Sequence, residues 1–215
     1  FSLSGGTVTL PRYATAAAYE AVYGHPHGAP ARIGQFSCAV PEHLRELKTP
    51  HVAHPGCFAT TILLAAVPLL ALDLVEPQLF VAATTGSTGS GRKPVEGTHH
   101  PLRHGDLYAY NALTHRHSAE IVACAQAASG AAAHFAFVPH SGPYARGIHA
   151  TVQAVLRRPL DTAALLARLT DFYAHSPLVQ VGASPPRLKE VVASCYARLG
   201  AVSDGQTPAQ EAFAR

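Results

Sequence analysis

The sequence predicts an α+β domain with a mixed, largely antiparallel sheet and helices on one face. Two strand-like runs, 134–139 and 147–156, follow one another without a helix between them, which argues against a regular alternation of strands and helices. Helix-like runs with apolar residues separate several of the other strand-like runs, so helices are expected to cover the sheet. Hydrophobic residues make up 48% of the 215 residues and charged residues only 13%, a composition that can bury one sizeable core.

Four segments are expected to be helical. The first spans residues 13–22. The second begins at Cys57 and runs to about residue 67, where Pro68 should end or kink it. A third is expected over 118–128, and Gly130 should stop it. A fourth is expected over 162–174, with Asp161 as its N-cap.

Six segments rich in β-branched and aromatic residues are expected to be strands. They are 79–85, 107–111, 134–139, 147–156, 179–181 and 188–196. The runs 147–156 and 188–196 alternate well enough to build a broad sheet, whose second face can bury against a second copy of the chain. We therefore expect a homodimer or a homotetramer.

The charge balance and the cysteines limit the function classes. The formal net charge is +3, from 16 Lys and Arg against 13 Asp and Glu, and this dispersed excess disfavours a nucleic-acid partner. No apolar run approaches the roughly 20 residues that span a bilayer and no signal peptide is visible, so we expect no membrane association. The cysteines lack a pairing pattern, which favours reduced thiols in the cytoplasm; they are Cys38, Cys57, Cys124 and Cys195.

Cys57 is the first candidate for covalent chemistry. It follows His54-Pro55-Gly56 and precedes the apolar stretch 62–70, so a Pro-Gly turn delivers the thiol to the first turn of a helix. Unpaired backbone N–H groups and the positive end of the helix dipole favour the thiolate there. The alternative is a small buried residue at the start of a core helix, which is a common role of intracellular cysteine.

Histidines cluster in the loop that is expected between the strand 107–111 and the helix 118–128. The run Thr114-His115-Arg116-His117-Ser118-Ala119-Glu120 contains two imidazoles, a guanidinium and a carboxylate. A histidine in such a loop can carry protons near neutral pH, with Glu120 fixing its tautomer or charge. With 14 histidines in the chain, a close pair can also arise without a function.

A glycine-rich segment, 84–93, follows the apolar run 79–85. Its glycines and hydroxyls would let the backbone approach an anion, and Arg92 and Lys93 add positive charge. Its spacing matches neither a Walker motif nor a dinucleotide fingerprint, and glycine–serine runs more often form ordinary loops.

Four motifs taken together resemble a known family. They are His-Pro-Gly-Cys-Phe-Ala-Thr at 54–60, Ser-Thr-Gly-Ser-Gly-Arg-Lys at 87–93, residues 114–121, and Phe-Val-Pro-His at 137–140 with Arg-Gly-Ile at 146–148. In this order they resemble the N-acetyl-gamma-glutamyl-phosphate reductases of arginine biosynthesis. The resemblance covers nearly the whole chain.

This resemblance implies a domain organisation. Residues 1–204 would be the catalytic, substrate-binding and dimerisation domain, like the C-terminal catalytic domain of glyceraldehyde-3-phosphate and semialdehyde dehydrogenases. The family's dinucleotide-binding domain is expected before Phe1, because no strand-Gly-x-Gly-x-x-Gly-helix unit occurs in the 215 residues. Residues 205–215 are polar and alanine-rich and are expected to form a weakly packed tail. The chain alone is expected to be inactive.

The resemblance also implies a reaction, the NADPH-dependent reduction of an acyl phosphate, N-acetyl-gamma-glutamyl phosphate, to N-acetylglutamate semialdehyde and phosphate. Cys57 would carry the acyl group as a thioester, and the His115/His117 pair would move protons, without the sequence saying which histidine points inward. Glu120 would orient the pair or bind substrate. The candidates for binding the substrate are Arg92, Arg116, Arg146 and His140, and those for binding NADP(H) are Ser87, Gly89, Ser90 and Gly91.

Other functions stay open. A relative in lysine biosynthesis reduces an aminoadipyl phosphate one methylene longer, and aspartate-semialdehyde dehydrogenase acts on a shorter acid. The run 114–117 favours the acetylglutamyl and aminoadipyl substrates over the shorter acid. An oligomerisation domain without turnover and a thiol hydrolase are the alternatives from other classes. We expect no metal, because neither His115-x-His117 nor His99-His100 supplies a recognised zinc ligand set with Cys57.

Overall fold

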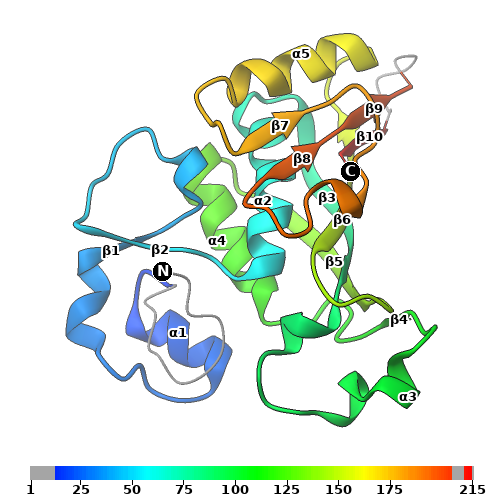
Figure 1. Cartoon of the computed structure of the whole chain (residues 1–215). Helices are drawn as coiled ribbons and strands as arrows, with labels where there is room; N and C mark the ends of the chain where they lie inside the picture. The colour runs from blue at the N-terminus through cyan, green and yellow to red at the C-terminus, as the bar shows by residue number, and fades with distance from the viewer. Residues whose placement is uncertain (1–12, 205–210, 215) are drawn as a thin grey trace.

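A six-stranded sheet forms the centre of the computed structural model, which describes residues 13–204 and 211–214 (Figure 1). The strands lie in the order β4 (Tyr108–Ala109), β5 (His134–Ser141), β3 (Val75–Thr85), β6 (Ile148–Leu156), β10 (Glu211–Ala214) and β9 (Ala201–Ser203). The pairing of β3 with β5 is parallel, whereas the other described pairings in this sheet are antiparallel. The predicted mixed, largely antiparallel sheet is therefore confirmed.

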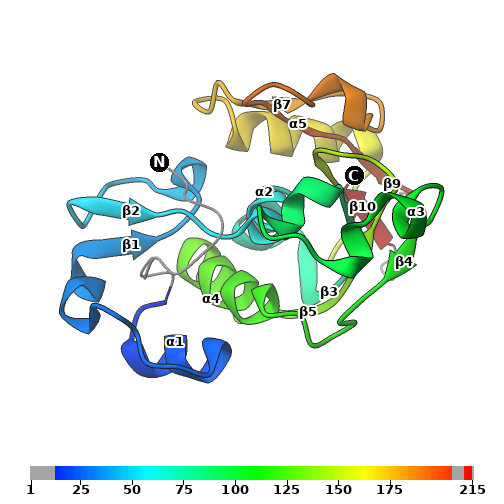
Figure 2. The same cartoon turned by 60° about the horizontal axis from the view of Figure 1, so that its bottom comes forward.

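Three helices cover one face of this sheet: α2 (Cys57–Ala71), α4 (His117–Ser129) and α5 (Thr162–Phe172). Helix α2 packs along α4 and contacts β3 and β6, while α5 contacts β9, an arrangement that Figures 1 and 2 show from two sides. Leu79, Val81 and Ala83 of β3 are buried in the core on this face. Phe80 and Ala82 alternate with them and are exposed on the opposite face. The α+β class with helices on one face is thus confirmed.

Smaller elements flank the central sheet. β1 (Phe36–Cys38) pairs in parallel with β2 (His51–Ala53), and β7 (Val179–Val181) pairs in parallel with β8 (Ala197–Leu199). The remaining α-helices among the described residues are α1 (Ala16–Tyr23) and the short α3 (His100–Arg103). The 3-10 turns are Pro30–Gln35, Pro41–His43, Ser87–Ser90, Glu96–Thr98 and Leu188–Glu190.

Helix α2 continues past Pro68 to Ala71, although Pro68 was expected to end or kink it. Proline has no N–H, so the carbonyl of Leu64, one turn earlier, loses its partner within the helix. The hydroxyl of Tyr173 donates a 2.6 Å hydrogen bond to that carbonyl. The contact between the end of α5 and the middle of α2 thus satisfies the acceptor that Pro68 leaves, which allows a buried helix to contain a proline.

The other predicted helices lie where expected, within a few residues at their ends. Asp161 accepts a 2.7 Å hydrogen bond from the N–H of Ala164 and caps α5 as predicted, and α4 ends at Gly130 in the left-handed conformation. The predicted strand 107–111 is reduced to the two residues of β4.

The predicted strand over 188–196 is wrong. Residues Leu188–Glu190 form a 3-10 turn, and the strand begins only with Ala197 in β8. The turn is stabilised locally because the Glu190 carboxylate accepts the N–H of Arg187 at 3.0 Å and forms an ion pair with Arg198. This segment therefore does not widen the central sheet as the sequence suggested.

The carboxyl end contributes a strand that the sequence did not indicate. Glu211–Ala214 form β10, whose backbone pairs with β6 on one side and β9 on the other. The rest of the expected weakly packed tail, 205–210 and 215, lies outside the described residues. Within the described part of the chain, no helix is both long and apolar enough to cross a membrane.

Candidate active site

Cys57 lies at the first position of α2, directly after the strand β2 and the turn His54-Pro55-Gly56. Gly56 is the N-cap residue in an extended conformation and has no side chain to cap the helix. The Cys57 side chain is exposed and lines a cavity of about 740 Å³. A thiol at this position faces the positive end of the α2 dipole, as the sequence suggested.

The imidazole of His117 packs directly on the turn that precedes the nucleophile. A Cβ atom at position 56 would lie only 2.5 Å from Nε2 of His117, so glycine is required there for the ring to come this close. His117 is the first residue of α4 and lines the same cavity as Cys57. The close approach places a proton carrier next to the residue that bears the thiol.

Glu120 supports the same turn from α4. Its carboxylate accepts a 3.0 Å hydrogen bond from the backbone N–H of Gly56, and the side chain is 1% exposed. A buried carboxylate on a backbone amide is a strong, directional contact. Glu120 is therefore placed to hold the Pro55–Gly56 backbone in position, and it does not line the cavity.

His115 has a different environment from His117. Its Nδ1 accepts a 3.2 Å hydrogen bond from the N–H of His117, and its ring meets Phe58 and Phe137 edge-on. Burial, with a smaller contribution from the Arg116 guanidinium, lowers the pKa of His115 below its usual value. His115 does not line the cavity, so of the two histidines it is His117 that shares the cavity with the thiol.

The glycine-rich segment forms one wall of the cavity through Thr88, Gly89, Ser90 and Gly91, whereas Ser87 lies outside the lining. Its backbone donors are already used. The N–H groups of Gly86, Ser87 and Thr88 donate to carbonyls of Gly147, Tyr144 and Ala145 at 2.9–3.2 Å. Those of Gly89 and Gly91 bond within the segment. The segment therefore packs against the loop 144–147 and does not present an open cradle of amides.

The predicted anion-binding residues separate into two groups. Arg146, which lies in the loop held by the glycine-rich segment, and Arg116 both line the cavity. Arg92 is exposed and does not line it. His140 lies on β5 between the buried residues Pro139 and Ser141, so its side chain is on the sheet face opposite the helices.

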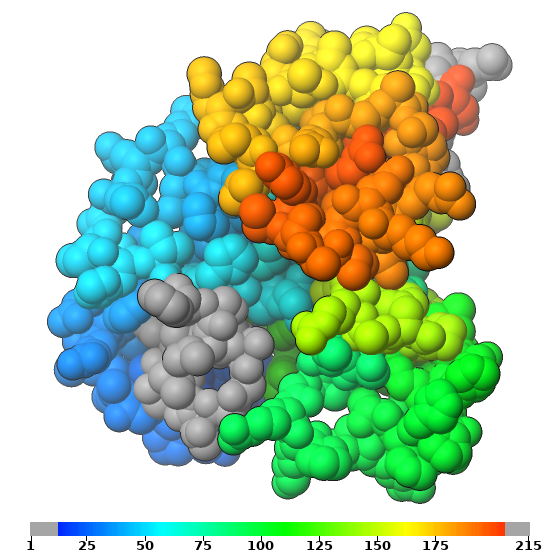
Figure 3. Space-filling view, viewed as in Figure 1, coloured from blue at the N-terminus to red at the C-terminus, as the bar shows by residue number. Residues whose placement is uncertain are grey.

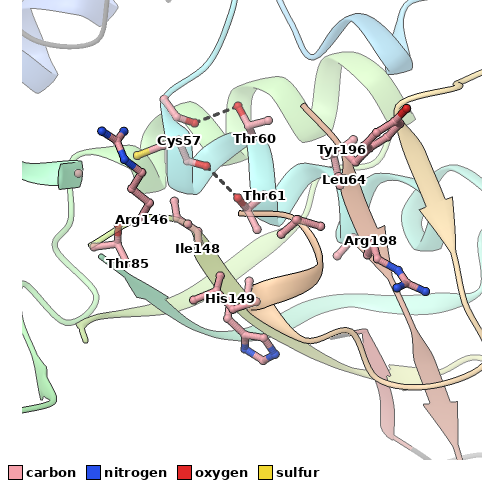
Figure 4. A pocket seen from close by; sticks show the side chains of 18 of the residues that line it. Cys57, Thr60, Thr61, Leu64, Thr85, Arg146, Ile148, His149, Tyr196 and Arg198 are labelled. Atoms are coloured by element: carbon pink, nitrogen blue, oxygen red, sulfur yellow. Dashed lines mark hydrogen bonds between the residues drawn. The ribbon is translucent and has the colours of Figure 1, made fainter. Parts of the chain in front are cut away.

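The cavity extends away from Cys57 toward the segment 182–199. Figure 4 shows the Cys57 sulfur and Arg146 at one end, with Tyr196 and Arg198 at the other. In Figure 3 the orange surface of this segment lies against the yellow-green surface of the 140s loop. Nη1 of Arg198 is 3.0 Å from Oε2 of Glu190. Neither Tyr196 nor Arg198 was predicted as a site residue: Tyr196 lies in the strand that was expected over 188–196, and no sequence motif marks Arg198.

Tyr110 is a further residue near the thiol that the sequence did not single out. Its ring meets His115 edge-on at 5.7 Å between centroids. Burial, followed by the nearby Cys57, raises the pKa of Tyr110 to about 12, so its hydroxyl remains a hydrogen-bond donor at neutral pH. No sequence motif marked this tyrosine, which follows the short strand β4.

Together these residues offer a nucleophile, a proton carrier and guanidinium groups around one cavity. Cys57 can attack an electrophilic carbonyl, His117 can exchange a proton beside it, and Arg116 and Arg146 can bind an anionic substituent. Within the described residues, no cluster of three or more His, Cys, Asp or Glu side chains is arranged to hold a metal ion.

Comparisons with known proteins show the family of this chain. The family model of the semialdehyde dehydrogenase dimerisation domain matches residues 57–212. An N-acetyl-gamma-glutamyl-phosphate reductase of Dehalococcoides mccartyi strain CBDB1 is 35% identical over 80% of this chain and 52% of its own length. That of Methanopyrus kandleri is 34% identical over 95% of this chain and 62% of its own length. The chain thus spans somewhat more than half the length of these curated relatives.

Solved structures show the same fold. A probable aspartate-semialdehyde dehydrogenase from Pseudomonas aeruginosa superimposes with a TM-score of 0.62 at 17% identity, covering 83% of this chain and 62% of the other. Aspartate-semialdehyde dehydrogenase II from Vibrio cholerae gives a TM-score of 0.57 at 13% identity, covering 76% and 56%. Since the family model matches well over half of the sequence, the chain belongs to the semialdehyde dehydrogenase family and contains its dimerisation domain.

Proposed function

We propose that this chain supplies the acyl-transfer site of an N-acetyl-gamma-glutamyl-phosphate reductase, an oxidoreductase of arginine biosynthesis acting in the cytoplasm. The observation that carries the proposal is the placement of Cys57 at the start of α2, with the His117 ring against Gly56 and Arg146 in the same cavity. The names of the curated relatives support this substrate, an acyl phosphate.

The proposed acyl transfer uses residues of this chain alone. The Cys57 thiolate attacks the acyl carbonyl, a carbon–sulfur bond forms, the bond to the phosphate oxygen breaks and phosphate leaves. His117 takes the thiol proton at the outset and later returns a proton to the substrate oxygen. Arg116 and Arg146 bind the phosphate and the substrate carboxylate, and backbone N–H groups at the start of α2 stabilise the oxyanion.

Reduction of the thioester requires a hydride, which NADPH would supply. The cavity wall formed by residues 88–91 can contact the edge of such a dinucleotide, since Gly91 has a φ of +84° and leaves open space beside it. However, the N–H groups of residues 86–89 and 91 donate to protein carbonyls, so this segment offers no open cradle for a pyrophosphate. The body of the dinucleotide would bind outside this chain's described residues, and the chain alone would not complete the reduction.

Two features bear on the choice of substrate. The cavity extends from Cys57 to the segment that contains Arg198. Arg198 lies at this far end and forms an ion pair with Glu190. Arg198 is thus an alternative partner for the one carboxylate that the acyl phosphate keeps, and its distance from Cys57 suits an acetylated or lengthened acid. The related aminoadipyl phosphate, one methylene longer, is the alternative substrate, because one methylene changes binding by only about 1–3 kcal/mol.

A second role of the chain is assembly into a homodimer. Phe80 is 49% exposed on the sheet face opposite the helices, beside Ala82, Ala136 and Val138, and these residues line a shallow hollow. A second copy of the chain would bury this face, in keeping with the description of the family as a dimerisation domain. An oligomerisation domain without turnover is the competing function that this face favours.

Acylation of the purified chain tests the catalytic proposal. We expect acetyl phosphate, and more rapidly N-acetyl-gamma-glutamyl phosphate, to leave one acyl group on Cys57 in intact-mass and peptide spectra. The adduct should disappear in Cys57→Ala, persist in Cys195→Ala, which removes another exposed cysteine, and form more slowly in His117→Ala. Equal labelling of Cys57 and Cys195, or none, would refute an acyl-transfer site. Release of free acid without NADPH would indicate a thiol hydrolase.

A further inference from the structure

Two cysteines that are distant in sequence meet behind the candidate active site. Sγ of Cys38 lies 3.6 Å from Sγ of Cys124, although the two residues are 86 positions apart. The Cys124 thiol also donates toward the carbonyl oxygen of Cys38 at 3.6 Å. Cys124 is buried, whereas Cys38 is partly exposed. The fold therefore creates a pair of thiols that the spacing of the four cysteines did not indicate.

Each thiol belongs to an element that supports the Cys57 turn. Cys38 ends β1 and is in register with Ala53, the last residue of β2, which leads directly into His54-Pro55-Gly56. Cys124 lies on α4 one turn after Glu120, whose carboxylate holds the N–H of Gly56. A bond between the two sulfur atoms would tie together the strand and the helix that fix the position of the nucleophile.

The buried Tyr13 lies near both the thiol pair and Glu120. Its phenol is buried, and its pKa is raised first by burial, then by Glu120, Tyr23, Cys38 and Cys124. The two thiols and the Glu120 carboxylate therefore act on one side chain. A change at the thiols is within reach of the residue that positions Gly56.

We propose that Cys38 and Cys124 form a redox-active site that a small peroxide converts into a disulfide. The more exposed Cys38 thiolate attacks the peroxide, the oxygen–oxygen bond breaks, and water leaves behind a sulfenic acid. The Cys124 thiol then attacks this sulfur and expels a second water, so two thiols lose two electrons to hydrogen peroxide, which is reduced to two waters. A dithiol reductant reverses the step by thiol–disulfide exchange.

The movement required is small. The sulfur atoms must approach by about 1.5 Å to reach the disulfide bond length of roughly 2.05 Å. β1 is a three-residue strand in a two-stranded sheet and none of its residues is fully buried, so it can shift toward the better buried α4. Such a shift would move Ala53 with it and change the presentation of Cys57.

The test uses the double variant Cys57→Ser/Cys195→Ser, in which Cys38 and Cys124 are the remaining cysteines. After treatment with an equivalent of hydrogen peroxide at neutral pH, we expect the intact mass to fall by two hydrogens. A linked peptide containing both residues should appear, dithiothreitol should restore both thiols, and the urea midpoint should rise because the unfolded chain is constrained. Overoxidation of either cysteine, intermolecular disulfides, or two thiols that still alkylate would overturn the proposal.

A second arm keeps the site testable if the double variant folds poorly. In the unsubstituted chain, peptide mapping after the same treatment should show the Cys38–Cys124 link with Cys195 still alkylatable, and the link should be absent in Cys38→Ala. With Cys57 as the reporter, we expect its alkylation rate by iodoacetamide to fall at least threefold when the disulfide has formed. The fall should not occur in Cys38→Ala. This result is independent of the acyl-transfer proposal, which is tested by acyl phosphate in the reduced chain.

Discussion

The Glu120 carboxylate accepts a hydrogen bond from the backbone N–H of Gly56, 3.0 Å away and 64 residues earlier in the chain. Gly56 is the residue before Cys57 and also the residue on which the His117 ring packs. One helix, α4, thus provides both His117, the proposed proton carrier, and the contact that fixes the backbone before Cys57. The relative positions of Cys57 and His117 depend on how α4 packs against α2.

Replacement of Glu120 should separate its positioning role from its charge. Glu120→Ala removes the acceptor of the Gly56 N–H and should lower the free energy of unfolding by about 1–3 kcal/mol, the cost of an unsatisfied buried donor. Glu120→Gln keeps an acceptor and should lose less. Urea unfolding and the rate of Cys57 alkylation measure the two effects. Equal stability of both variants would contradict a hydrogen bond to Gly56.

The two histidines should differ in their effect on Cys57. His117→Ala should slow Cys57 alkylation several-fold at neutral pH and move its pH profile upward, because His117, unlike His115, lines the cavity with Cys57. In His115→Ala the profile should keep its midpoint, since burial lowers the pKa of His115 and leaves that ring neutral near pH 7. Iodoacetamide rates between pH 5 and 9 distinguish them. A shift of the midpoint in His115→Ala alone would reverse the assignment.

Much of this arrangement could be predicted from the sequence because it depends on local signals. The Pro-Gly turn before Cys57, the Asp161 N-cap and the Gly130 stop each act within one turn of helix, and all three lie where predicted. The strand predicted over 188–196 failed because Glu190 binds the N–H of Arg187 and the guanidinium of Arg198, contacts that strand-like composition does not reveal.

Contacts between segments that are distant in the chain could not be predicted from the sequence. The glycines of 86–91 suggested an anion cradle, whereas the amides of residues 86–88 bind carbonyls in the loop 144–147 and those of Gly89 and Gly91 bond within the segment. Likewise, the extension of α2 past Pro68 depends on Tyr173, more than 100 residues later. In the site, the sequence selected Cys57 and His117, but only the packing of α4 on Gly56 distinguishes His117 from His115.

A substitution at Gly86 should test how the loop of Arg146 is held. A Cβ at position 86 would lie 2.5 Å from the carbonyl oxygen of Ala145 and 2.7 Å from the N atom of Arg146, so the backbone of that loop has to move. Inorganic phosphate bound at Arg146 should protect Cys57 from alkylation by iodoacetamide. We expect Gly86→Ala to weaken this protection at least threefold. Gly34→Ala is the matched control, because a Cβ there meets nothing within 4 Å. Equal protection in both variants would show that the loop does not depend on Gly86.

The apolar sheet face should determine the oligomeric state. Phe80→Glu places a charge on the exposed face of β3, and we expect it to convert a dimer into a monomer at micromolar concentration. Leu178→Glu changes a similarly exposed apolar residue outside the central sheet and should leave the dimer intact. Light scattering coupled to size-exclusion chromatography measures both. A monomeric unsubstituted chain, or a dimeric Phe80→Glu variant, would place the interface elsewhere.

His43 should make the stability of the fold depend on pH between about 4 and 6.5. Its Nε2 lies 2.9 Å from the Tyr173 hydroxyl, and burial lowers its pKa to about 4. The unfolded chain therefore binds a proton below the ordinary histidine pKa of about 6.5, whereas folded His43 stays neutral until about pH 4. As the pH is lowered from about 6.5 to about 4, the contribution of His43 should reduce the free energy of unfolding by up to about 1.4 kcal/mol per pH unit.

Urea unfolding at several pH values, with His43→Gln beside the unsubstituted chain, isolates this contribution. The variant should lose part of the pH dependence between pH 6.5 and 4, because glutamine does not titrate. His175→Gln removes an exposed histidine and should keep the pH dependence. Because the Tyr173 hydroxyl donates its hydrogen to the Leu64 carbonyl, protonation of His43 acts at the contact between α5 and α2, close to the core. Parallel pH curves for all three proteins would show that His43 titrates as it does in the unfolded chain.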